Sequence, residues 1–141
     1  KSGYGYDMHM NGNVICRDFD VESGLALNSK SELKLENGFA AFTKDFFDNG
    51  AYVIENNQTH EVSLRDPEGK NYLNVYFPEA PLFGLWSAEK KNAPYAAIEP
   101  WFGRCDKEDF NGSLEEREWG HALAQGACFQ AAYTIEIAGE D

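Results

Sequence analysis

The chain contains little basic charge and no long apolar run. Its 141 residues include 12 Lys and Arg against 24 Asp and Glu, which gives a formal net charge of −12. This excess of negative charge repels nucleic-acid backbones and anionic lipid headgroups. The uncharged apolar runs extend over only a few residues, whereas a membrane-spanning helix needs about 20. We therefore expect a soluble protein whose partners include neither nucleic acid nor a membrane.

Cysteine is also scarce, and the motifs of several enzyme classes are missing. Cys16, Cys105 and Cys128 are odd in number and show no C-x-x-C spacing, so neither a disulfide framework nor a zinc knuckle is predicted. The three histidines are scattered without metal-ligand or triad spacing, and the sequence has no glycine-rich phosphate loop, nucleophile elbow or H-E-x-x-H motif. These absences predict no metal site, and the unpaired cysteines favour a cytoplasmic location.

Helical periodicity is almost absent, and alternation with a period of two takes its place. In residues 129–137, Phe129, Ala131, Tyr133, Ile135 and Ile137 fall on one face, which predicts a half-buried antiparallel strand. Residues 60–65 and 72–77 alternate in the same way around the turn sequence Asp-Pro-Glu-Gly at 66–69, which predicts a hairpin. Further strands are predicted at 51–55, 82–87, 95–99 and, more weakly, 31–35, with short helical turns at 43–47 and 114–117. Many short strands without interleaved helices predict an all-β fold, an antiparallel β-sandwich formed by residues 1–141 as a single domain.

Residues 95–106 read Y-A-A-I-E-P-W-F-G-R-C-D and carry the strongest candidate for chemistry. Glu99 follows an uncharged strand and precedes a proline and two aromatic residues, so a rigid strand end places its carboxylate beside an aromatic wall. Such a carboxylate is suited to general acid or base catalysis. The alternative is a glutamate at the rim that is paired with Arg104 or with a lysine.

Two tryptophans near predicted strand ends are candidates for ligand binding. Trp86 and Trp101 present flat indoles of the kind that stack on the apolar C–H faces of sugar rings. The alternative for each is an ordinary packing role in the core. Trp119 lies among charged residues, so we expect it to anchor a surface loop.

Three segments together resemble the C-terminal half of the aldose 1-epimerase (galactose mutarotase-like) family. They are F-G-L-W-S at 83–87, A-P-Y-A-A-I-E-P-W-F-G at 93–103 with Asp106, and L-A-Q-G-A-C-F at 123–129. The resemblance extends from about residue 33 to residue 137, and I-E-P-W-F-G is its most specific part. It implies the family's large antiparallel supersandwich, of which this chain is expected to be a partial domain. The chain begins with Lys1 rather than methionine, so we expect a processed, truncated or excerpted N-terminus.

The resemblance also implies an activity, the interconversion of the α and β anomers of a free aldohexose. Glu99 matches the family's base, which takes a proton from the C1 hydroxyl while a histidine protonates the ring oxygen. No metal or organic cofactor is required. The family's catalytic histidine belongs to an N-terminal half that this sequence does not contain, and none of His9, His60 and His121 lies where the motif would place it. Asp48 is a further candidate to bind a sugar hydroxyl. The sequence supports an ordinary structural role for this aspartate in a turn at least as well.

Several alternatives remain open at this point. A non-catalytic carbohydrate-binding module would keep the aromatic platform and the carboxylate without the acid. A glycosidase would pair Glu99 with Asp106 or Asp109, with the two carboxyl groups about 5–9.5 Å apart. A plain interaction domain would lack a cleft around Glu99. Because part of a sandwich exposes sheet edges and core, we also expect a homodimer or association with the missing N-terminal half.

Overall fold

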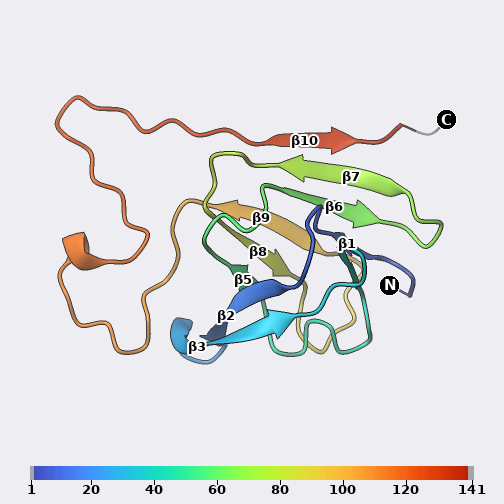
Figure 1. Cartoon of the computed structure of the whole chain (residues 1–141). Helices are drawn as coiled ribbons and strands as arrows, with labels where there is room; N and C mark the ends of the chain where they lie inside the picture. Colours follow the sequence, from blue (N-terminus) through green and yellow to red (C-terminus); the bar gives the residue numbers. More distant parts are fainter. Residues whose placement is uncertain (1, 140–141) are drawn as a thin grey trace.

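The computed structural model describes residues 2–139, and this part of the chain is almost entirely β-structure (Figure 1). It contains no α-helix, only a single 3₁₀ turn, η1 (Leu114–Glu116). The strands are β1 (Gly5–Asp7), β2 (Val14–Asp20), β3 (Leu25–Leu33), β4 (Phe39–Ala41), β5 (Tyr52–Ile54), β6 (Glu61–Arg65), β7 (Asn71–Tyr76), β8 (Leu82–Trp86), β9 (Ala97–Trp101) and β10 (Thr134–Ile137).

The strands form two five-stranded sheets, and all neighbouring strands are antiparallel. Sheet A has the order β10-β7-β6-β1-β4, and sheet B has the order β3-β2-β5-β8-β9. Their apolar faces pack on each other, because Tyr6 and Val62 of sheet A share one buried cluster with Ile54 and Leu85 of sheet B. The predicted antiparallel β-sandwich is therefore confirmed.

The predicted hairpin is also confirmed. It consists of β6 and β7, in which Val62 stands opposite Val75 and Leu64 opposite Leu73. The turn between them is closed by a hydrogen bond from the Gly69 N–H to the Asp66 carbonyl. Gly69 has a φ of 87°, a conformation that favours glycine. The turn residues therefore set the register that buries the apolar side of both strands.

The prediction for residues 129–137 was wrong in two respects. Only residues 134–137 form a strand, and all four residues of β10 are exposed. The exposed fractions are 54 % for Ile135 and 76 % for Ile137. Alternation correctly identified a strand with one apolar face, but β10 is the outermost strand of sheet A (Figure 1), and no described element covers that face.

Other boundaries differ in ways that affect the site. The strand predicted at 95–99 is β9 (Ala97–Trp101), so Glu99 lies in the middle of a strand rather than at its end. Pro100 is accommodated because β9 is an edge strand, where a missing N–H donor costs little. The segment 43–47 forms successive i→i+3 turns instead of a helix. Strands β1, β2 and β4 were not predicted.

Candidate functional site

The pairing of β8 with β9 places Glu99 and both candidate tryptophans on one face of sheet B. Gly84 stands opposite Glu99, Leu82 opposite Trp101 and Trp86 opposite Ala97. The intervening residues Phe83, Leu85 and Ile98 pack in or against the core. Because side chains alternate along a strand, Glu99, Trp86 and Trp101 point away from the core. We call this side of sheet B the outer face.

The distance of each indole from Glu99 follows from the register. Trp101 is two residues from Glu99 on the same strand, and Trp86 is its diagonal neighbour across β8. Diagonal neighbours in an antiparallel pair lie about 7–8 Å apart, within reach of aromatic side chains. All three side chains are partly exposed. The structure thus brings together three of the four predicted site residues, one carboxylate between two indoles.

Gly84 makes room for the indole of Trp101. A Cβ at Gly84 would lie 2.6 Å from Cζ2 of Trp101, well inside van der Waals contact. The indole therefore lies over Gly84, the residue directly opposite Glu99. A glycine at this position leaves the space that the aromatic ring occupies, which is a local reason for the glycine of F-G-L-W in β8.

Glu99 has no hydrogen-bond or ion-pair partner among the described residues. Arg104, which would neutralise Glu99 if it were a rim glutamate, instead pairs with Glu55 and Glu118. The charge of Glu99 acts on Tyr6, whose pKa is raised first by burial and then by that charge. Tyr6 is fully buried and donates its hydroxyl to the Ala97 carbonyl at 2.8 Å. No side chain among the described residues therefore neutralises the Glu99 carboxylate through an ion pair.

Asp48 does not join this group. It lines a separate hollow together with Arg17, Val21, Tyr52 and Lys90, and neither Glu99 nor either tryptophan lines that hollow. The aspartate therefore has no geometric support as a partner of Glu99.

Trp86 packs against Tyr95, with ring centroids 5.8 Å apart and an interplanar angle of 46°.

Trp101 forms one wall of an apolar hollow on the outer face that the sequence did not predict. The lining residues come from β2, β5 and the segment that follows Glu99: Phe19, Val53, Pro100, Trp101, Phe102, Gly103, Arg104 and Cys105. Val53 belongs to this face because it stands opposite Gly84. The hollow was missed because β2 was not recognised: its alternation is clear only from Val14 to Cys16 and is interrupted where the register shifts between Arg17 and Phe19.

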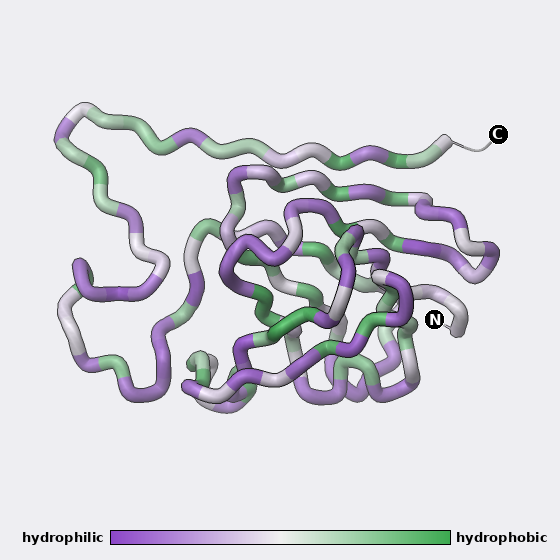
Figure 2. Tube along the Cα trace, viewed as in Figure 1, coloured by the Kyte–Doolittle hydropathy of each residue, from purple (hydrophilic) through white to green (hydrophobic). Residues whose placement is uncertain are grey.

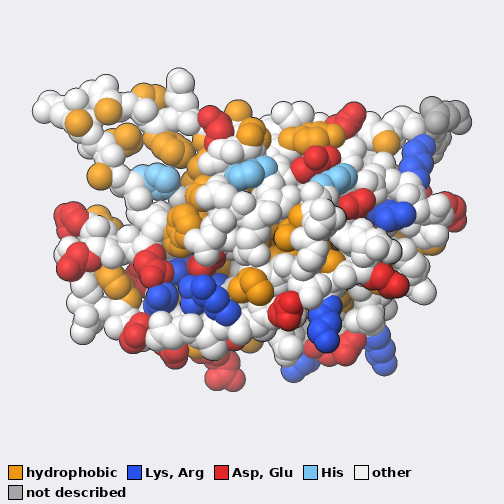
Figure 3. Space-filling view, viewed as in Figure 1, with side chains coloured by type: hydrophobic (Ala, Val, Ile, Leu, Met, Phe, Trp, Pro, Cys, Tyr) orange, Lys and Arg blue, Asp and Glu red, His pale blue; other side chains and the backbone are white. Residues whose placement is uncertain are grey.

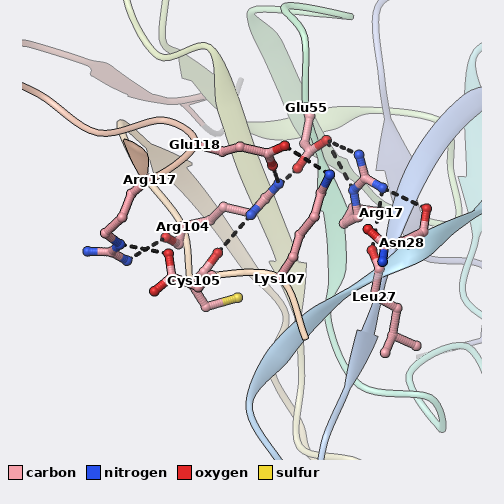
Figure 4. A network of polar contacts seen from close by, with 10 residues as sticks. Arg17, Leu27, Asn28, Glu55, Arg104, Cys105, Lys107, Arg117 and Glu118 are labelled. Atoms are coloured by element: carbon pink, nitrogen blue, oxygen red, sulfur yellow. Dashed lines mark hydrogen bonds and ion pairs between the residues drawn. The ribbon is translucent and has the colours of Figure 1, made fainter. Parts of the chain in front are cut away.

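An ion-pair network closes one end of the outer face (Figure 4). Glu55, at the end of β5, accepts hydrogen bonds from Arg17 and Arg104, and Arg104 also contacts Glu118. Only 1 % of the Arg104 side chain and 5 % of the Glu55 side chain are exposed. Burial alone would raise the pKa of Glu55, but the hydrogen bonds from Arg104 and Arg17 outweigh it and lower that pKa. The network fixes the segment after β9 against sheet B.

The histidines lie elsewhere, and none of them contacts Glu99. Nε2 of His9 is 2.7 Å from Oγ of Ser63 and 3.4 Å from Oε1 of Glu61. His60 contacts the Phe77 carbonyl and His121 contacts the Phe102 carbonyl.

Within residues 2–139, no three His, Cys, Asp or Glu side chains are grouped as a metal site would require. In this part of the chain no helix is long and apolar enough to cross a bilayer.

The glycosidase pairing of Glu99 with Asp109 is not formed, and Asp106 is engaged by an arginine. Asp106 is paired with Arg117 at 2.7 Å, and Asp109 accepts a hydrogen bond from Asn28 of β3. Strands β3 and β9 are opposite edges of sheet B, four interstrand spacings or about 19 Å apart. This is roughly twice the separation that either glycosidase geometry uses, so Asp109 cannot act on one sugar together with Glu99.

The comparison with known proteins agrees with this architecture. No protein-family model and no curated protein sequence matches the chain. Two solved structures do. A galactose mutarotase related enzyme from Lactobacillus acidophilus matches 99 % of the chain with a TM-score of 0.84 and 29 % identity. A galactose mutarotase-like protein from Lactobacillus casei matches 97 % of it with a TM-score of 0.83 and 20 % identity.

The chain therefore has the fold of the galactose mutarotase-like β-sandwich proteins, and its resemblance to that family is confirmed. The match to the Lactobacillus acidophilus protein includes the N-terminal strands, which the sequence motifs did not reach. The chain spans about half the length of these structures, 46 % of one and 47 % of the other. The expectation of a partial domain is consistent with this coverage.

Proposed function

We propose that this chain is aldose 1-epimerase-like and that its outer face binds a free aldohexose with Glu99 as the catalytic base. The observation that carries the proposal is the unpaired carboxylate of Glu99 between two partly exposed indoles on a rigid sheet. The fold shared with galactose mutarotase-related proteins supports the same conclusion. A cytoplasmic location belongs to the proposal and is supported by the three free cysteines.

The proposed reaction needs only proton transfer. Glu99 accepts the proton of the C1 hydroxyl as the bond between C1 and the ring oxygen breaks, and an acid gives a proton to that oxygen. Rotation about the C1–C2 bond and reclosure of the aldehyde produce the other anomer, with no net change in atoms or electrons. The indoles of Trp86 and Trp101 stack on the apolar C–H faces of the sugar. The chemistry requires neither a metal nor an organic cofactor.

The proposal assigns the base to this chain but leaves the acid unassigned. The ring nitrogens of His9, His60 and His121 contact groups other than Glu99, and the Tyr6 hydroxyl is buried and bonded to a carbonyl. This observation favours a second candidate function, a carbohydrate-binding module that holds the sugar without catalysing its epimerisation. The two candidates share the same face and differ only in turnover.

Polarimetry of freshly dissolved α-glucose and α-galactose tests the first candidate. We expect the native chain to accelerate mutarotation and Glu99→Gln to lose about 100-fold or more of that acceleration, the usual contribution of a general base. Glu68→Gln removes the same charge from the exposed hairpin turn and should leave the rate unchanged. Equal rates for the native chain and Glu99→Gln would show that Glu99 is not the base.

Ligand binding separates the second candidate from the first. If the native chain does not accelerate mutarotation, tryptophan fluorescence and calorimetry with the same sugars show whether they bind. A binding module requires a saturable signal that Trp101→Ala weakens by about tenfold or more, since stacking against an aromatic ring contributes on the order of 1 kcal/mol or more. Absence of both turnover and binding would contradict both candidates for these sugars.

A further inference from the structure

The strand that carries Glu99 is paired on one side only. β9 is an edge strand of sheet B, and β8 is its single neighbour among the described strands. Segments with few contacts open more readily than central strands do. A general base, however, must be held within about 0.5 Å of its productive position. Glu99 therefore needs support in addition to the pairing of β9 with β8.

Two buried hydroxyl groups hold the chain just before Glu99. The Tyr6 hydroxyl donates to the Ala97 carbonyl at 2.8 Å, and the Ser87 hydroxyl donates to the Tyr95 carbonyl at 2.8 Å. Neither donor residue is exposed to solvent. Ser87 directly follows β8, so its bond extends a pairing that already exists. Tyr6 belongs to β1 of sheet A, so its bond connects β9 to the opposite sheet.

Tyr6 is held firmly by its own surroundings. It lies on β1, which pairs with β4 on one side and with β6 on the other. Its ring packs edge-on against Phe42 and Phe47, with ring centroids 4.8 Å and 6.3 Å away. Figure 2 shows hydrophobic stretches in the strands of both sheets, which contribute to the buried cluster around this ring. Close packing leaves the hydroxyl little freedom, so the Ala97 carbonyl is bound to a rigid part of the core.

No cation orients the Glu99 carboxylate. It has no ion-pair partner among the described residues, the net charge is −12, and Figure 3 shows acidic side chains spread over the face in view. Its direction therefore depends on the backbone of β9. Burial, and then the charge of Glu99, raises the pKa of Tyr6. The hydroxyl thus stays protonated at neutral pH, where its bond to the carbonyl does not vary with pH.

We propose that Tyr6 is a positioning residue for Glu99. By holding the Ala97 carbonyl, its hydroxyl fixes the edge strand relative to sheet A and thereby fixes the direction of the carboxylate. Ala97 and Glu99 are one repeat of side-chain alternation apart, so a rotation of β9 at the first residue turns the second in the same sense. The inference rests on the proposed function, in which Glu99 is the base.

Tyr6→Phe tests this role, because it removes the hydroxyl and keeps the ring that packs in the core. We expect kcat for mutarotation to fall by about tenfold or more and KM to stay within about twofold, since misplacement by about 1 Å costs rate while the indoles that bind the sugar are unchanged. The pH dependence of the remaining activity should keep its shape, because Tyr6 exchanges no proton with the sugar.

Tyr52→Phe is the matched control. The Tyr52 hydroxyl donates to the Phe46 carbonyl at 2.6 Å, a bond of the same kind that does not involve β9. Its loss should leave kcat and KM unchanged. Amide hydrogen exchange adds a measurement that does not require turnover. Tyr6→Phe should accelerate exchange in β9 by about tenfold relative to the rest of sheet B, and Tyr52→Phe should not.

The outcomes separate this inference from the proposed function. If Glu99→Gln loses activity while Tyr6→Phe keeps it, Glu99 remains the base and the positioning role of Tyr6 is overturned. A loss of kcat that Tyr52→Phe shares would reflect general destabilisation and would also overturn it. If the native chain does not accelerate mutarotation, the proposed function fails and hydrogen exchange decides. Faster exchange confined to β9 then supports the hold of Tyr6 on this strand, and unchanged exchange in β9 excludes it.

Discussion

Gly84 and Glu99 illustrate how one residue without a side chain shapes the environment of a functional one. They stand opposite each other on neighbouring strands, and the indole of Trp101 occupies the space that a Cβ at Gly84 would take. The glycine thus brings an aromatic plane beside the carboxylate without any polar contact to neutralise it. Neither residue is informative alone, since the pairing register creates the site.

We expect Gly84→Ala to displace the Trp101 indole and to destabilise the fold by about 1–3 kcal/mol, the typical cost of overpacking. The Cβ would lie 2.6 Å from the ring, so either the ring or the strand must move. Urea unfolding monitored by tryptophan fluorescence measures both effects. Gly139→Ala is the matched control because nothing lies within 4 Å of its Cβ position, and its unfolding free energy should stay within about 0.5 kcal/mol of the native value.

The segment after β9 is held to sheet B by charges of very unequal burial. Arg104 is almost completely buried between Glu55 and Glu118, whereas the contact of Lys107 with Glu118, at 2.9 Å, is partly exposed. A buried pair that loses one partner leaves an uncompensated charge in a medium of low polarity. An exposed pair exchanges its contact for water at little cost. The two cations should therefore differ in importance even though they contact the same carboxylate.

Removing the buried cation should cost much more than removing the exposed one. We expect Arg104→Met to destabilise the protein by about 3–5 kcal/mol and Lys107→Met by at most about 1 kcal/mol. Equilibrium denaturation of the two variants under identical salt conditions measures the difference. Similar values for both would mean that the contact between Arg104 and Glu55 is exposed to water in solution.

At the scale of strands, the sequence predicted most of sheet B and the hairpin of sheet A. The hairpin was predictable because the turn residues around Gly69 and the alternation of its strands agree. Strand β2 was missed because residues such as Arg17 and Asp18 obscure its alternation, and its partner β3 was recognised only at its end. The face that Glu99 shares with the tryptophans could not be derived from the sequence, because it depends on the one-residue register between β8 and β9.

The whole molecule should lose stability in acid, partly through Glu55. The folded pKa of this carboxylate is lowered, because hydrogen bonds from Arg104 and Arg17 outweigh the effect of burial. A lowered folded pKa stabilises the native state above the unfolded pKa of about 4.3, and that contribution is lost as the pH falls through the folded value. Glu118 adds in the same direction, mainly through its hydrogen bond with Lys107.

We therefore expect the free energy of unfolding to fall as the pH is lowered below about 4.3, with a shallower slope in Glu55→Gln than in the native chain. The variant will be less stable at neutral pH, so the comparison concerns the slope rather than the level. Denaturant titrations at several pH values between neutral and acid give both. An identical slope in the two proteins would exclude Glu55 as a source of acid sensitivity.

The contact between β3 and the segment after β9 has a consequence for how the protein forms during synthesis. The Ala26 N–H bonds to the Asp106 carbonyl, and the Glu108 N–H bonds to the Ala26 carbonyl. The outer edge of β3 therefore has no partner until residue 108 has left the ribosome, several seconds later at about 5–20 residues per second. Throughout that interval Lys30 and Glu32 keep the nascent edge hydrated, so the polar sequence of β3 protects a chain that is still incomplete.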